Sequence, residues 1–117
     1  MSTEPLAIAV AARALDGLMM RYTAISQNIA NAGSERAQTI GVDFETSLKA
    51  AASRGPGAVE ALRFGYHAEP ATSLSADRRI DLQLADAAVT AARYAAVSDM
   101  LARRLSMQAS AITGGRS

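Results

Sequence analysis

The fold of this chain is decided by residues 8–32, which read IAVAARALDGLMMRYTAISQNIANA. Apolar side chains recur there at alternating gaps of three and four, the spacing of a helical seam that meets another helix. The seam consists of Ile8, Ala11, Leu15, Leu18, Tyr22, Ile25, Ile29 and Ala32. A helix with so narrow a seam is marginal in water, so this segment needs a partner surface elsewhere.

The flanking residues set the ends of this first helix. Thr3 can cap it, and Pro5 in the first turn loses no hydrogen bond. Gly33 and Ser34 end it, which predicts a helix of roughly 28 residues that stops near Asn31. On spacing alone, the amides of Asn28 and Asn31 predict a cap at its C-terminal end.

A second long helix is predicted from about residue 81 to residue 112, before Thr113, Gly114 and Gly115. Its seam has the same alternating gaps and consists of Leu84, Ala87, Ala91, Tyr94, Ser98, Leu101, Leu105, Gln108 and Ile112, with Val97 and Met107 beside it. Asp99 and Arg103 are four residues apart and predict an exposed ion pair. Two seams at opposite ends of one chain predict that the helices pair with each other.

The middle of the chain gives weaker signals. Residues 33–41 predict a loop, followed by a short helix that Asp43 caps, with Phe44, Leu48 and Ala51 or Ala52 on one face. Residues 55–79 predict a loop, with short strands at 61–66 and 73–80 or disorder as alternatives. The predicted fold is all-α and forms one structural domain. Residues 1–32 and 80–117 form a coiled coil, and residues 33–79 form a loop-rich middle.

Composition excludes several classes of function. The chain has 117 residues, a net charge of +1 and no cysteine. No large electric field would attract nucleic acid or anionic lipid, and neither disulfides nor thiolate metal sites can form. No stretch approaches the roughly 18 apolar residues of a membrane span, and the start lacks the pattern of a cleaved signal peptide. We expect a protein that binds no nucleic acid, spans no membrane and keeps its N-terminus.

The sequence gives little support for an enzyme. His67, followed by Glu69, is the only histidine, and a single loop histidine without a second histidine or a cysteine is a weak metal or acid–base candidate. The serines lack the context of a nucleophile, and the glycines form no phosphate-binding loop. The basic doublets at 78–79 and 103–104 have no aromatic neighbours and predict solvated faces. We therefore predict no catalytic, cofactor-binding or metal-binding residues, and no cofactor.

One set of motifs resembles a known family. Residues 21–31, RYTAISQNIAN, followed by the VDFE segment at 42–45, resemble the N-terminal signature of bacterial flagellar axial proteins. The closest resemblance is to the small proximal-rod subunit of the basal body, the FlgB type. The motif residues are Asn28, Ile29, Ala30, Asn31, Val42, Asp43, Phe44 and Glu45. Residues 80–82, 93–94 and 111–115 are similar to that family's closing helix. The residues at 34–37, SERA, differ from the family's usual Thr-Pro-Gly-Tyr.

The resemblance implies a structural subunit of the flagellar basal-body rod, which transmits torque for motility. It implies uncleaved export through the type III apparatus and a place in the periplasmic rod. The implied partners are other rod subunits, the basal-body ring and export-gate base, and further copies in a helical assembly. The expected subunit-interface residues are Leu15, Leu18, Tyr22, Ile25, Ile29, Tyr94, Leu101, Leu105 and Ile112.

Two other functions stay open at this point. One is a soluble helical-hairpin dimer that serves as an adapter or export chaperone of the flagellar system and buries its own seams. The other is an enzyme that cleaves the cell wall during rod passage. The second is disfavoured, because such an enzyme needs a cleft and a pair of carboxylates at catalytic spacing.

Overall fold

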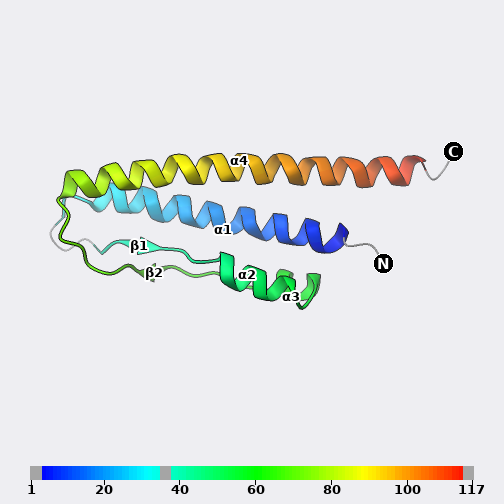
Figure 1. Cartoon of the computed structure of the whole chain (residues 1–117), viewed down its shortest axis with the longest axis horizontal. Helices are drawn as coiled ribbons and strands as arrows, with labels where there is room; N and C mark the ends of the chain where they lie inside the picture. The colour runs from blue at the N-terminus through cyan, green and yellow to red at the C-terminus, as the bar shows by residue number, and fades with distance from the viewer. Residues whose placement is uncertain (1–3, 35–37, 115–117) are drawn as a thin grey trace.

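The computed structural model describes residues 4–34 and 38–114, which form an elongated molecule with extents of 65 × 25 × 14 Å (Figure 1). The elements in chain order are α1 (Glu4–Asn31), β1 (Ile40–Gly41), α2 (Glu45–Ala52), α3 (Pro56–Ala61), β2 (His67–Ala68) and α4 (Ala76–Gly114). The two long helices run antiparallel along the molecule. The predicted all-α fold with paired terminal helices is confirmed, and the predicted end of the first helix at Asn31 is correct.

Helix α1 is the central layer of the molecule. Helix α4 packs along one side of it, and α2, α3 and β1 pack on the other (Figure 1). The two short strands pair antiparallel, with Ile40 opposite Ala68 and Gly41 opposite His67. Because α1 has partners on two sides, its apolar residues are not confined to one narrow seam.

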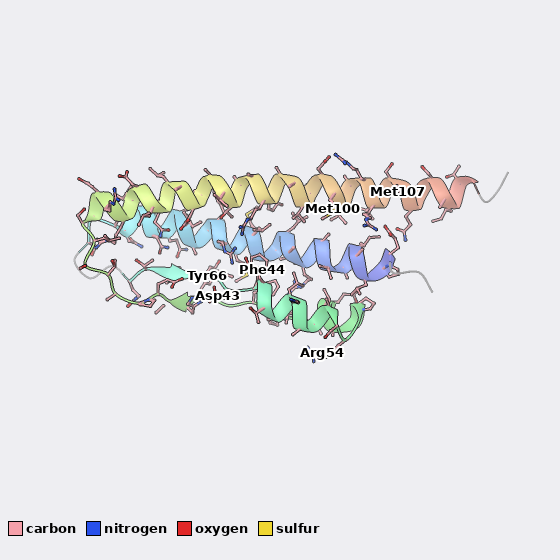
Figure 2. All side chains as sticks on the ribbon, viewed as in Figure 1. Asp43, Phe44, Arg54, Tyr66, Met100 and Met107 are labelled. Carbon is pink, nitrogen blue, oxygen red and sulfur yellow. The ribbon has the colours of Figure 1, made fainter. Side chains whose placement is uncertain are left out.

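The hydrophobic core lies between α1 and the α2–α3 pair. Its buried members are Ala9, Leu18, Ala24, Val42, Phe44, Leu48, Ala51 and Val59. Phe44 lies where the start of α2 meets α1 (Figure 2), with its ring against Gly17 and 5.6 Å from the ring of Phe64. The prediction that Phe44, Leu48 and Ala51 share one buried face is confirmed.

The structure corrects several predictions for the middle of the chain. Asp43 does not cap α2: Phe44 occupies the N-cap position without a side-chain hydrogen bond, and Asp43 instead lies 3.4 Å from His67. Residues 56–61 form a helix rather than a loop, because proline at the first helical position supports helix initiation. Short strands do occur in the middle region, but not at the predicted positions 61–66 and 73–80: they are β1 and β2, and α4 already begins at Ala76. The predictions for Thr3, for residues 35–37 and for Gly115 lie outside the described residues.

The seam of α4 differs from the predicted one. The buried or half-buried residues that recur along α4 at gaps of three and four are Ile80, Gln83, Ala87, Thr90, Tyr94, Val97, Leu101 and Arg104. Three of these, Ala87, Tyr94 and Leu101, belong to the predicted seam, and Val97 was predicted beside it. The other predicted seam residues are exposed: Leu84, Ala91, Ser98, Leu105, Gln108 and Ile112. The exposed Asp99–Arg103 pair is confirmed, with 2.6 Å between Asp99 Oδ2 and Arg103 Nη2.

Candidate subunit interface

Asn28 joins three elements of the fold. Its side-chain amide donates to the carbonyl oxygen of Ile40 at 2.8 Å, and its Oδ1 accepts from the Ile40 N–H at 2.9 Å. The same amide donates to Oε1 of Gln83 on α4 at 3.1 Å. An asparagine side chain has the donor and acceptor of a peptide group, so Asn28 occupies the place of a third strand beside β1.

The prediction that Asn28 caps the first helix is therefore wrong. Its side chain is buried and directed toward β1 and α4. At the end of α1, the N–H of Ser34 bonds to the Asn31 carbonyl, and Arg79 donates to the Ala32 carbonyl at 2.8 Å. Arg79 is the residue that sequence analysis missed here, because it lies 47 positions away on α4.

Arg21 makes a second set of contacts between α1 and the VDFE segment. Its guanidinium forms two hydrogen bonds with Glu45, at 2.7 and 2.6 Å, and donates to the Val42 carbonyl at 2.8 Å. It also lies 4.6 Å from the centre of the Phe44 ring, a cation–π arrangement. Arg93 of α4 extends this group, with 4.0 Å between its Nη1 and Glu45 Oε2. These contacts explain why the two motif segments lie together.

The hydrogen bonds from Arg21 lower the pKa of Glu45 to about 2, from an ordinary value of 4.5. A carboxyl whose pKa is lower in the folded state stabilises the fold above its unfolded pKa. That contribution is lost as the pH falls from about 4.5 toward 2. The Glu45 side chain is 53% exposed, so solvent screening limits the contribution to roughly 1 kcal/mol.

A Glu45→Gln variant should therefore be less stable than the natural chain by about 1 kcal/mol at pH 7. The two unfolding free energies should converge as the pH falls through about 2, because Glu45 becomes protonated in the folded state only there and both side chains are then uncharged. Urea titrations across this range measure the difference. Glu60→Gln, at an exposed carboxylate on α3, is the matched control and should show no such convergence. A difference that stays constant from neutral to acid pH would contradict the role of this pair.

The structure places the predicted interface residues in three environments. Leu18 and Ile25 are buried within the chain, and Leu15, Ile29, Tyr94 and Leu101 are half-buried. Tyr22, Leu105 and Ile112 are exposed. Of the two seam tyrosines, Tyr94 packs against the core, whereas Tyr22 is 44% exposed. Of the predicted set, only these three exposed residues present much surface to another molecule.

Helix α4 exposes several large apolar side chains. Within this 39-residue helix, Thr90 is the one fully buried residue. Its large exposed apolar residues are Leu82, Leu84, Val89, Met100, Leu105, Met107 and Ile112 (Figure 2 labels Met100 and Met107). At about 100° per residue they lie on more than one side of the helix, and we call them together the outer face of α4. Numerous alanines lie between them. A helix that is apolar around most of its circumference is usually buried on more than one side.

The C-terminal part of α4 extends past the start of α1. Arg104 Nη1 and Glu4 Oε2 are 2.9 Å apart, so Arg104 lies beside the first residue of α1. Residues 105–114 continue beyond it, about 15 Å of helix at 1.5 Å per residue. Figure 1 shows this extension at the end of the molecule where both termini lie. It includes Leu105, Met107 and Ile112 of the outer face.

The described residues offer few other candidate sites. None of the helices described is long and apolar enough to cross a membrane. Across residues 4–34 and 38–114, no group of three acidic, histidine or cysteine residues is arranged to hold a metal ion. His67 lies 3.4 Å from Asp43 and 3.3 Å from Glu69, contacts that link β2 to the start of α2. No protein-family model, curated protein or solved structure matches the chain.

Proposed function

We propose that this protein is a structural subunit of the bacterial flagellar basal-body rod, as the resemblance of residues 21–31 and 42–45 implies. In this role it is exported through the type III apparatus and packs with other rod subunits in the periplasm, where the assembly transmits torque. The observation that carries the proposal is the outer face of α4, whose large apolar side chains remain exposed in the single chain. A helical assembly of many copies would bury them.

Two further observations support the same function. The motif residues Asn28, Val42 and Phe44 are buried, and they hold the VDFE segment against α1. The motif thus has a structural use in positioning the middle region beside the helical pair. The exposed extension 105–114 lies at one end of a 65 Å molecule, as suits a contact between successive subunits along an axis.

The adapter or export-chaperone function remains the alternative. A stable helical-hairpin dimer buries its own seams, so its helix content should not depend on protein concentration. Mass spectrometry of purified hook–basal bodies from the source cell separates the two functions. Peptides from 22–36 and 94–103 that stay with the rod after a high-salt wash support the rod subunit. Their absence there, with abundant protein in the soluble fraction, would support the adapter instead.

A variant of the outer face tests the role of that face directly. Leu105→Glu adds a charge at a side chain that is 47% exposed, so the monomer should keep its stability to within about 0.5 kcal/mol. Incorporation into basal bodies and swimming should both be lost. Ser110→Glu adds the same charge to an exposed polar position of the same extension and should assemble normally. Normal swimming of the Leu105→Glu strain would contradict the proposal.

A Leu18→Asp variant would not test the role of the outer face of α4. Leu18 is 3% exposed and lies in the core, so a carboxylate there would unfold the subunit rather than block its contacts. Leu101 is half-buried against α1 and carries the same difficulty. The exposed residues of α4 are the positions where folding and assembly can be separated.

A further inference from the structure

Helix α4 is held by α1 and by very little else. Among the described elements, α1 is the only one that packs along it. Its contact with α2 is the 4.0 Å ion pair between Arg93 and Glu45. The named contacts across the α1–α4 interface are Gln83 with Asn28, Arg104 with Glu4 and Arg79 with the carbonyl of Ala32.

The rest of the chain has a core of its own. Every buried member of the hydrophobic cluster belongs to α1, α2, α3 or the segment that follows β1. Helix α4 adds only partly buried side chains to it, Tyr94 and Val97. All buried members of this cluster therefore come from residues 4–69.

The segment between β2 and α4 is where the chain would have to open for α4 to leave α1. Residues 70–75 are all exposed, and they reverse the chain direction at one end of the molecule (Figure 1). Pro70 favours extended backbone at Glu69, the conformation that an open hinge requires. Six extended residues span about 20 Å, roughly twice the 8–10 Å between the axes of packed helices. An opened hinge can thus deliver α4 to a neighbouring molecule.

We propose that α4 is an exchangeable arm, which leaves α1 of its own copy and occupies the same face of α1 in a second copy. The receiving surface fits because it is the surface that α4 already covers, and the three polar contacts re-form without loss. The connecting loop favours the closed monomer at low concentration through its high effective concentration. A high concentration of copies favours exchange, because the second copy then competes with the chain's own α1. The proposal rests on these contacts and does not depend on the rod.

Chemical cross-linking between differently marked copies tests the exchange. The natural chain has no cysteine, so single substitutions give unique reactive sites. One sample carries Glu4→Cys and the other Arg104→Cys. A direct disulfide needs Cβ atoms about 4 Å apart. The natural ion pair joins two long side chains whose Cβ atoms are farther apart, so a short bis-maleimide reagent is used instead. After mixing, we expect a covalent heterodimer whose yield rises with protein concentration.

A matched mixture sets the background from random collisions. It combines Glu4→Cys with Ser98→Cys, a residue of α4 that is exposed and lies outside the seam facing α1. The Glu4→Cys and Arg104→Cys mixture should exceed this control several-fold. A chain that carries both substitutions calibrates the reagent by linking internally. Equal heterodimer yields in both mixtures at every concentration would overturn the proposal.

A shortened hinge gives an independent readout. Deleting residues 71–74 leaves Pro70 and Ser75, about 7 Å of extended chain, which is less than the 8–10 Å between the axes of packed helices. Helix α4 then cannot return to its own α1, so the variant should be a folded dimer by light scattering at concentrations where the natural chain is a monomer. A folded, monomeric deletion variant would overturn the proposal. Both measurements use purified protein, so their results are independent of whether the protein is incorporated into basal bodies.

Discussion

Replacing Asn28 by alanine is expected to lower the free energy of unfolding by about 2–4 kcal/mol. The substitution removes both hydrogen bonds to the Ile40 peptide and the one to Gln83. Each buried polar group that loses its partner costs about 1–3 kcal/mol. Part of this cost is recovered by water, because Ile40 is half-buried rather than fully enclosed. Urea titration followed by circular dichroism measures the change.

Asn28→Asp separates hydrogen bonding from shape. The carboxylate can still accept from the Ile40 N–H, but it faces the Ile40 carbonyl and Gln83 Oε1 without a donor. This nearly isosteric variant should therefore also be destabilised at neutral pH. Asn31→Ala, at the exposed asparagine of the same motif, is the control and should change stability little. Similar stabilities for Asn28→Ala and Asn31→Ala would contradict the proposed role of the Asn28 side chain.

Replacing Gly17 by alanine is expected to destabilise the fold by about 1–3 kcal/mol, the usual cost of overpacking a core. A Cβ at this position would lie 2.4 Å from Cγ of Phe44. The ring cannot easily retreat, since Arg21 and Phe64 also contact it. Helix propensity alone predicts the opposite sign, a gain of about 1 kcal/mol. Thermal or denaturant unfolding of the variant decides between them.

The matched control for this variant is Gly57→Ala in α3. No atom lies within 4 Å of the position that its Cβ would take, so this change should be neutral or stabilising. A second test removes the obstacle: in a chain that carries Phe44→Ala, the further change Gly17→Ala should become favourable. If Gly17→Ala stabilises the natural chain, the close packing of Phe44 against α1 is wrong.

The two long helices could be predicted because their signal is local. Apolar gaps of three and four persist through residues 8–32, and the end of α1 at Asn31 follows from the glycine and serine just after it. The side of α4 that meets α1 could not be predicted in the same way. Alanines occur all around this helix and mark no face, and the buried side includes the polar residues Gln83, Thr90 and Arg104.

The candidate site was harder to predict because its contacts are distant in sequence. The partners of Asn28 lie 12 and 55 positions away, whereas a capping interaction needs only local residues. Arg21 likewise reaches Glu45 across 24 positions. The motif segments could be recognised as motifs from their order, but the hydrogen bonds that join them required the fold.

The position of α1 as the central layer has a consequence for mutational tolerance. Substitutions in α1 are constrained on two sides, by α4 and by the middle region, so its buried and half-buried positions cannot vary without cost to folding. The outer face of α4 has no such constraint from its own chain. If the protein acted as a monomer, these positions could change to polar residues without cost. Apolar residues that are kept there in divergent sequences would therefore indicate selection for contact with another molecule.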